Sequence, residues 1–217
     1  MPVNREPLNR ERVLAAALAL ADEGGVESLS MRKLAKGVGV EAMSLYNHVA
    51  NKDDLIDGIV DLVFAEIEAP VPGVEWKTAL RRRAVATREA LRRHPWANGL
   101  MEARPKPGPF NLALHEAVLR CLREAGFSVA MTARAYSIQD SFIYGFALQE
   151  KALPDFDDPA VSAAVAERVL RQTDPTGLPY SEEMVRVHIA SGGYSLTAEF
   201  EFGLNLILDG LDALRSG

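Results

Sequence analysis

Apolar residues recur every three to four positions along almost the whole chain of 217 residues, and no strand-like alternation persists. This period places the apolar side chains on one face of an α-helix, so it predicts an all-α fold. Residues suited to starting or ending a helix stand at the borders of these stretches. They are Asn9, Ser30 and Asn51 at helix starts, and Gly24, Gly25, Gly37 and Gly39 at helix ends.

Prolines and glycines divide the chain into two parts. The segment Ala69-Pro-Val-Pro-Gly-Val-Glu75 breaks the helical pattern and separates a small head, residues 1–69, from a larger body, residues 70–217. In the head we expect helices over about 10–24, 31–38, 41–48 and from 52 onward. In the body we expect them over about 75–94, 96–103, 109–125, 128–152 and 159–172, then from Ser181, and over 194–214.

Residues 30–52 have the layout of a helix, a glycine-bearing turn, a short second helix and a lysine that opens a third. This is the arrangement of a helix-turn-helix, in which the second helix enters the major groove of DNA. The positions that fit a buried face are Leu34, Ala35, Val38, Val40, Leu45 and Val49. The polar residues left outside are Arg32, Ser44, Tyr46, Asn47, His48 and Lys52. The head is therefore predicted to be a three-helix DNA-binding domain.

The distribution of charge agrees with a small DNA-binding face. The formal net charge is -6, but residues 1–52 carry seven Lys/Arg and six Asp/Glu, against seventeen and twenty-four in the remainder. An acidic body with a near-neutral head suits a protein that touches DNA only through the head. Because phosphate contacts release counterions, we expect binding to weaken markedly as the salt concentration rises.

Several features argue against other classes of protein. No apolar run approaches the length of a membrane span, and the start Met-Pro-Val-Asn-Arg-Glu does not have the pattern of a signal peptide. We therefore expect a cytoplasmic protein without a membrane partner. The single cysteine, Cys121, excludes an internal disulfide and a cysteine-rich zinc site, and its helical setting predicts a buried thiol. We expect no metal and no cofactor.

An enzyme built on a helical bundle is the alternative from a different class. The Glu-x-x-His pairs of di-iron bundles are absent, and His115 and Glu116 are adjacent rather than one turn apart. A Gly-x-Ser-x-Gly motif, a phosphate-binding loop and a metal-binding histidine pair are absent as well. We therefore expect a protein that is not an enzyme.

The last predicted helix has more apolar surface than a single contact can bury. Its main stripe consists of Phe200, Leu204, Ile207, Leu208, Leu211 and Leu214, while Phe202 and Leu206 lie outside it. Such a helix needs two surfaces to pack against. Gly203 and Gly210 would allow another helix to approach closely. One face can serve the core of the chain and the other a partner chain; the alternative is a fully buried central helix of a monomer.

These features together resemble the TetR family of bacterial transcriptional repressors. The resemblance is strongest in Leu29-Ser-Met-Arg-Lys-Leu-Ala-Lys-Gly-Val-Gly-Val-Glu41 and Ser44-Leu-Tyr-Asn-His-Val-Ala-Asn-Lys-Asp-Asp-Leu55. The body is similar to the tetracycline-repressor branch at Ala103-Arg-Pro105, Ala125-Gly-Phe-Ser128 and 200–211. The resemblance implies an all-helical body, residues 70–217, that dimerises through a four-helix bundle and holds a small-molecule effector pocket coupled to the heads.

The resemblance implies that the chain would act as a ligand-responsive repressor. It would bind a palindromic operator in double-stranded DNA as a homodimer, and a small-molecule effector would release it. An activator or a dual regulator of the same fold stays open, because the sign of regulation depends on where the operator lies relative to the promoter.

The resemblance also implies which residues touch DNA. Ala42, Met43 and Ser44 would face base edges at the start of the recognition helix. Arg32 would reach a guanine through its bidentate fork. The residues expected at phosphates are Ser30, Tyr46, His48 and Lys52, with Asn47 at either a phosphate or a base. The tetracycline-repressor branch has glutamine and proline at positions 42 and 43, so we expect a different operator, recognised partly through apolar contact and DNA shape.

The effector is expected to be a small, mainly apolar molecule with one or two polar groups. The residues expected to line its pocket are Trp96, Leu100, Arg104, Phe110, His115, Tyr136, Gln139, Phe142 and Phe146. Leu100 stands where the tetracycline-repressor branch has its metal-binding histidine, so a magnesium complex would have few ligands here. Any single residue of this set could instead belong to the ordinary core.

Overall fold

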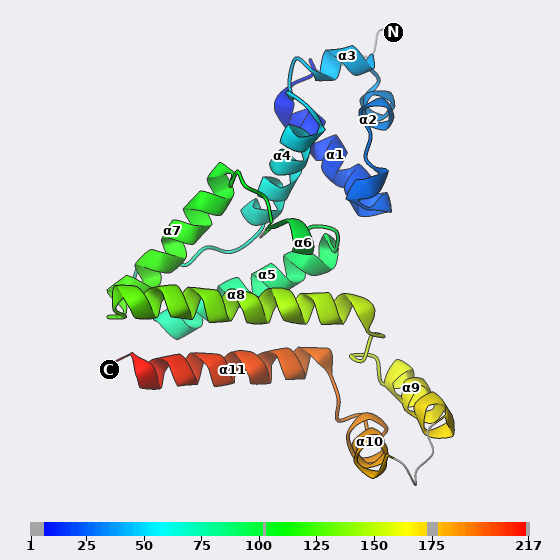
Figure 1. Cartoon of the computed structure of the whole chain (residues 1–217), viewed down its shortest axis with the longest axis vertical. Coiled ribbons are helices and arrows are strands. Elements are labelled where there is room, and N and C mark those ends of the chain that lie inside the picture. The colour runs from blue at the N-terminus through cyan, green and yellow to red at the C-terminus, as the bar shows by residue number, and fades with distance from the viewer. Residues whose placement is uncertain (1–6, 102, 173–177, 216–217) are drawn as a thin grey trace. The chain divides into compact units, whose positions relative to one another are not determined.

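The computed structural model describes residues 7–101, 103–172 and 178–215, and this part of the chain consists of helices joined by turns (Figure 1). The predicted all-α fold is thereby confirmed. Met1–Ala125 and Gly126–Gly217 form two units, which we describe separately. Over the described ranges, none of the helices combines the length and the apolar content needed to cross a membrane.

Each unit contains several helices. The first holds α1 (Arg10–Gly24), the short 3-10 helix η1 (Val26–Ser28), α2 (Met31–Val38), α3 (Ala42–Leu45), α4 (Lys52–Ala65), α5 (Trp76–Arg93), α6 (Asn98–Met101) and α7 (Pro109–Glu124). The second holds α8 (Val129–Ala152), α9 (Pro159–Gln172), α10 (Pro179–Met184), the π-helical turn η2 (Val185–Ile189) and α11 (Leu196–Leu214).

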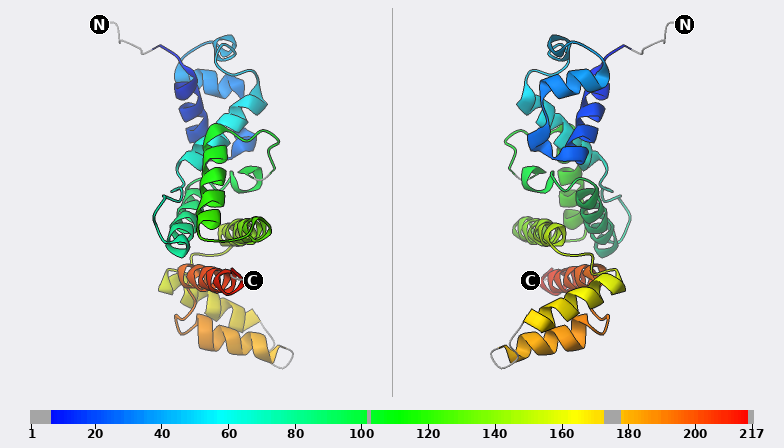
Figure 2. Two further views of the ribbon diagram at one scale, coloured as in Figure 1. Left: turned by 90° about the vertical axis from the view of Figure 1, so that its left-hand side faces the viewer. Right: turned by 90° about the vertical axis from the view of Figure 1, so that its right-hand side faces the viewer.

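Helices α1, α2 and α4 pack around one apolar core in the first unit (Figure 2). Val13 and Ala17 of α1 are completely buried, as are Leu34 of α2 and Leu55 and Ile59 of α4. Within α1 and α4 these residues are four positions apart, so they lie on one face of each helix. The apolar period of the sequence thus selects the faces that meet in the core.

Local capping sets the starts of these helices. The side-chain oxygen of Asn9 accepts from the N–H of Arg12 at 2.8 Å, that of Ser30 from Lys33 at 3.2 Å, and that of Asn51 from Asp54 at 2.8 Å. Each bond satisfies a backbone N–H that has no partner inside its helix. At the end of α2, Gly39 has a φ of 74°, the left-handed conformation that glycine adopts readily.

The third predicted helix is shorter than expected. We expected residues 41–48, but α3 covers only Ala42–Leu45, and residues 46–48 form a turn. Two bonds to the backbone explain the difference: the carbonyl of His48 accepts from Arg10, 38 residues away, and the N–H of Ala50 donates to Asp54 in the first turn of α4. The predicted buried face also differs, since Val38 and Val40 are only half-buried. The other four positions, Leu34, Ala35, Leu45 and Val49, are buried.

Helix α4 also packs against α7, and Asp61 joins the two. Its buried carboxylate accepts from the N–H groups of Phe110 at 3.3 Å and Asn111 at 3.0 Å, in the first turn of α7. A Cβ added at Gly108 would lie 2.2 Å from this carboxylate, so the glycine permits the approach. The neighbouring α6 is shorter than the expected range 96–103, since the chain turns at Ala97, whose N–H donates to the carbonyl of His94 at 2.9 Å. Residue 102 lies outside the described residues.

Helices α8 and α11 lie side by side in the second unit (Figures 1 and 2). The ring of Phe200 on α11 lies 5.4 Å from the ring of Phe142 and 5.1 Å from that of Phe146, both on α8. A Cβ added at Gly203 would lie 2.7 Å from the Phe142 ring, whereas one added at Gly210 would meet nothing within 4 Å. The close approach expected at Gly203 is therefore made by α8 of the same chain.

The predicted apolar stripe of α11 is only partly buried. Phe200, Leu204, Leu208 and Leu211 are buried, while Ile207 is half-buried and Leu214 is exposed. With 3.6 residues per turn, Ile207 and Leu214 lie at the edge of the face that α8 covers.

The remaining boundaries of the second unit differ slightly from the expected ones. Helix α9 has the expected bounds, but α10 begins at Pro179 rather than Ser181, because proline fits the first turn of a helix. Helix α11 begins at Leu196 rather than Tyr194, since Ser195 caps it and the Tyr194 ring packs edge-on against Phe156 at 5.0 Å. Residues 173–177, between α9 and α10, lie outside the described residues.

Candidate nucleic-acid interface and effector residues

The nine residues predicted to contact DNA lie on α2 or its cap, on α3, in the turn after α3 and at the start of α4. Arg32, Met43, Tyr46, Asn47 and Lys52 are exposed, and Ser30, Ala42, Ser44 and His48 are half-buried. Every one of them therefore has some surface open to a ligand. The predicted roles of the individual residues stay predictions.

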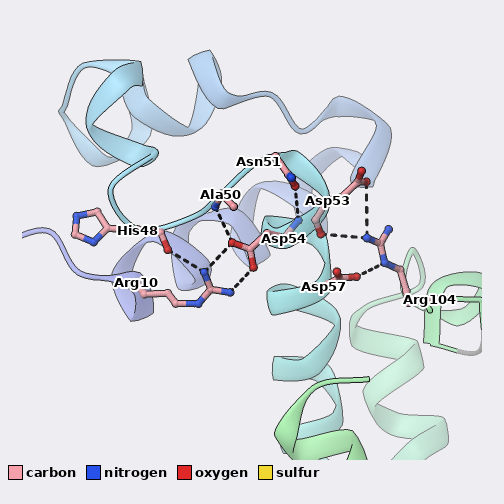
Figure 3. Close-up of polar contacts among 8 residues, drawn as sticks. All are labelled: Arg10, His48, Ala50, Asn51, Asp53, Asp54, Asp57 and Arg104. Atoms are coloured by element: carbon pink, nitrogen blue, oxygen red, sulfur yellow. Dashed lines mark hydrogen bonds and ion pairs between the residues drawn. The ribbon is translucent and has the colours of Figure 1, made fainter. Parts of the chain in front are cut away.

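The turn between α3 and α4 is held by Arg10, whose role the sequence did not reveal (Figure 3). Its Nη1 donates to the carbonyl of His48 at 2.8 Å and to Oδ2 of Asp54 at 3.0 Å, and its Nη2 donates to Oδ1 of Asp54 at 2.7 Å. Oδ2 of Asp54 also accepts from the N–H of Ala50 at 2.7 Å. We call these four residues the Arg10 network; it ties the first residue of α1 to the segment that follows the recognition helix.

The ion pair in the Arg10 network shifts the pKa values of both Arg10 and Asp54. The hydrogen bond from Arg10 lowers the pKa of Asp54; burial opposes this effect, and the N–H of Ala50 adds to it. The same bond raises the pKa of Arg10. Because the two side chains are 47% and 31% exposed, water screens the pair. The network therefore fixes the position of the turn more than it adds to stability.

The network uses the backbone of His48 and not its ring. Figure 3 shows this imidazole pointing away from Arg10, on the outer side of the turn. Lys52 is exposed and is the first residue of α4, where the unpaired N–H groups of the helix give a partial positive charge. Contacts of both groups with phosphates stay predictions.

In the first unit, the side chains of two predicted effector residues, Trp96 and Arg104, make tertiary contacts. The indole N–H of Trp96 donates to Asp22 at 2.7 Å, and the ring is buried. Arg104 donates to the carboxylate of Asp57 and, at 3.1 Å, to the carbonyl of Asp53, so it joins the segment before α7 to α4 (Figure 3). The three others differ in exposure: Leu100 and His115 are half-buried, and Phe110 is exposed.

In the second unit, the predicted effector residues lie along α8. Phe142 and Phe146 pack against Phe200, so they contribute to the contact between α8 and α11. Gln139 is buried and Tyr136 is half-buried. Their contribution to an effector pocket stays a prediction, and the rings have a structural role in either case.

Cys121 is half-buried on α7, where a buried thiol was expected. Burial raises the pKa of this thiol, and Glu124 and Glu75 raise it further, so it stays protonated and is a weak nucleophile at neutral pH. Among the described residues, no group of three or more His, Cys, Asp or Glu side chains is placed to hold a metal ion.

Two family models together match most of the chain. Residues 13–59 match the model of the bacterial regulatory proteins of the tetR family, and residues 69–215 match the tetracyclin repressor-like C-terminal domain. The chain belongs to the TetR family. It is therefore a DNA-binding transcriptional regulator with a helix-turn-helix, as the resemblance implied.

Individual TetR-family proteins are similar over nearly the whole chain. An HTH-type transcriptional regulator of Saccharopolyspora erythraea is 33% identical over 208 residues, which is 95% of this chain and 85% of the relative. The HTH-type transcriptional repressor DrrR1 of Streptomyces coeruleorubidus is 32% identical over 221 residues, covering 95% and 78%. The solved structure of apo ActR from Streptomyces coelicolor has a TM-score of 0.78 and 26% identity, and the match covers 97% of this chain and 98% of ActR.

The names of these TetR-family relatives are those of regulators and repressors, which supports the expectation that the chain is not an enzyme. In the head, the motifs that carry the resemblance lie in residues 29–55, and they did not point to Arg10. Its partners His48 and Asp54 are 38 and 44 residues away, so no local pattern could have indicated the contact. A local signal was the pair of acidic residues, Asp53 and Asp54, in the first turn of α4.

Proposed function

We propose that this TetR-family regulator is a ligand-responsive repressor, which binds a palindromic operator as a homodimer and is released by a small, mainly apolar effector. The exposed face of Arg32, Met43, Tyr46, Asn47 and Lys52 carries this proposal, because it combines base-reading and phosphate-binding groups on a helix-turn-helix. We assign DNA binding to residues 1–69, and effector binding and dimerisation to residues 70–217.

The exposed apolar surface of α11 supports the homodimer. Phe202 and Leu206 are 68% and 66% exposed, on the side of α11 away from the buried residues. Ile138 of α8 and Leu214 of α11 are exposed as well, beside an open groove lined by residues of both helices. A second copy that packs its own α8 and α11 here would remove this apolar area from water and complete a four-helix bundle.

A dimer with two heads explains why the operator should be palindromic. Each recognition helix reads one half-site, and the half-sites of such dimers are separated by about 34–36 Å or a multiple of it. An effector that favours a different separation of the heads would prevent both from binding at once. A useful switch needs a preference of a few kcal/mol, since roughly 5.5 kcal/mol shifts a population from 1:99 to 99:1.

The relatives support a small-molecule effector. One solved structure of ActR contains actinorhodin, and several curated relatives are tetracycline repressor proteins. In this chain the residues proposed for the pocket are mostly aromatic or apolar, and Leu100 cannot coordinate a metal. We therefore propose a mainly apolar effector that binds without a magnesium ion.

Selection of bound duplexes from a random pool at low salt tests DNA binding. We expect an inverted repeat, and light scattering should give the mass of a dimer both free and on the selected DNA. Candidate apolar molecules are then screened for release of the DNA. Failure to enrich any duplex, or a monomer at micromolar concentration, would contradict the proposal.

A reporter assay distinguishes a repressor from an activator of the same fold. Deleting the gene should raise transcription from a promoter that contains the selected operator, and adding the effector should have the same result. If deletion lowers transcription instead, the protein is an activator.

A further inference from the structure

His94, directly after α5, lies between two carboxylates that come from different helices. Its Nδ1 is 2.7 Å from Oδ1 of Asp22, near the end of α1, and its Nε2 is 3.0 Å from Oε1 of Glu66, directly after α4. The His94 side chain is only 7% exposed. The same oxygen of Asp22 accepts the indole N–H of Trp96. One imidazole thus contacts α1 and the end of α4 from the corner between α5 and α6.

The hydrogen-bond donors and acceptors around His94 indicate the protonation state of its ring. An ionised carboxylate only accepts hydrogen bonds, and a neutral imidazole has one N–H and one acceptor nitrogen. A neutral ring would therefore place a lone pair against a carboxylate oxygen on one of its two sides. Only the imidazolium donates to both Asp22 and Glu66.

Neighbouring charges support the protonated form. Arg93 donates to Oε2 of Glu66 from Nε at 3.0 Å and from Nη2 at 2.6 Å. Burial raises the pKa of Glu66, but the hydrogen bonds from Arg93 and His94 outweigh this effect, and its pKa lies below the ordinary value. The charged groups that face the ring are therefore Asp22 from α1, and Glu66 with Arg93 beside it. With a protonated His94, two negative and two positive charges balance.

We propose that protonated His94 is a positioning residue for DNA binding, which holds the end of α1 against the end of α4 and the α5–α6 corner. Helix α1 packs against both α2 and α4, so its position determines where the helix-turn-helix lies in the first unit. When the ring loses its proton, one of the two bonds is replaced by repulsion, and α1 is held less firmly. Operator affinity should then fall as the pH rises and the ring loses its proton.

This inference rests on the proposed operator binding. The first test therefore uses no DNA, so that the protonation of His94 is tested independently of operator binding. The chain has four histidines, so nitrogen NMR of histidine-labelled, full-length protein can resolve them, and His94→Gln assigns the signal. We expect both ring nitrogens of His94 to carry protons at pH 6. In the Trp76→Phe variant, Trp96 is the single tryptophan, and its fluorescence should titrate together with the His94 signal. A neutral His94 ring at pH 6 would overturn the inference.

The second test measures affinity for a selected operator between pH 5.5 and 8.5. His48 lies on the DNA face and would also bind less well when neutral, so the pH profile is compared in a His48→Gln background. There, His94→Gln should weaken binding roughly tenfold at the lowest pH and remove the remaining pH dependence. His188→Gln is the matched control, since His188 pairs with Glu199 at 3.4 Å but is 45% exposed and lies in the second unit. Parallel pH profiles with and without His94 would contradict the inference.

Asp22→Asn keeps the inference testable if His94→Gln does not fold. The amide of this variant can donate to a neutral ring, which can then still donate to Glu66. We expect operator affinity close to that of the wild type at low pH and a flat profile up to high pH in the same His48→Gln background. A profile as steep as that of the parent would overturn the inference. If neither protein bound any duplex, the proposed operator binding would fail, while the NMR result would still decide whether His94 is protonated.

Discussion

The face formed by α2, α3 and the start of α4 differs from the outer face of α11 in what it exposes to water. The first presents polar groups, such as Arg32, Asn47 and Lys52, on a backbone that caps and the Arg10 network hold in place. The second presents large apolar side chains, Phe202 and Leu206, on one uninterrupted helix.

The difference indicates two kinds of partner. Exposed charges stay well solvated in the free chain and gain most from a charged partner such as phosphate, so binding there should depend strongly on salt. Exposed Phe and Leu are unfavourable in water by about 25 cal/mol for each Å² of apolar surface, and a second apolar surface relieves that cost. Binding at α11 should therefore depend little on salt.

Replacing Phe202 and Leu206 together by glutamate should have the largest effect. Charges on α11 would prevent the second copy from packing there, and the two heads would no longer bind one duplex together. We expect a monomer by light scattering and a loss of operator affinity of at least about a hundredfold by fluorescence anisotropy. Leu112→Glu, at an exposed position of α7, is the matched control. A dimeric double variant would show that dimerisation uses another surface.

Arg32→Ala should have the next largest effect, and only on certain sequences. Loss of a bidentate contact to guanine should relax base preference at one position in each half-site by about 1–3 kcal/mol. Quantitative selection with the variant and the wild type measures this change. If affinity fell equally for every sequence, Arg32 would contact a phosphate instead of a base.

Lys52→Ala should weaken binding by a similar factor on every sequence. The slope of log affinity against log salt should also fall, by about 1 for each phosphate that the lysine no longer neutralises. Lys36→Ala, at an exposed position of α2, is the control and should leave that slope unchanged. An unchanged slope in Lys52→Ala would mean that this lysine does not reach the DNA.

The smallest effect is expected from Asp54→Asn. This variant should change the free energy of unfolding. Since the folded state lowers the pKa of Asp54, its pair with Arg10 stabilises the fold above the unfolded pKa of about 3.9, and this contribution is lost as the pH falls through the lower folded value. Between pH 7 and pH 3, the free energy of unfolding measured in urea should fall more steeply for the wild type than for Asp54→Asn. The difference should stay below about 1 kcal/mol, because the pair is partly exposed. Parallel curves would contradict a role for this pair in stability.

Helix boundaries could be predicted well where local contacts decide them. Asn9, Ser30 and Asn51 cap the helices that they were expected to cap, because a capping bond joins residues only three positions apart. The end of α3 was predicted wrongly, since a partner on α1 binds the backbone of His48 there. The nine residues predicted to contact DNA belong to one compact motif, whereas the residues predicted to bind the effector are scattered over 96–146.

The sequence by itself determined that this chain is all-α, where most of its helices begin, and which family it belongs to. These properties follow from the apolar period and from capping, which act over three or four residues, and from a motif that is continuous in the chain. The tertiary structure decided that Arg10 holds the turn after α3 and that His94 lies between Asp22 and Glu66. Those contacts join residues 28 to 72 positions apart, so they exist only after the helices have packed.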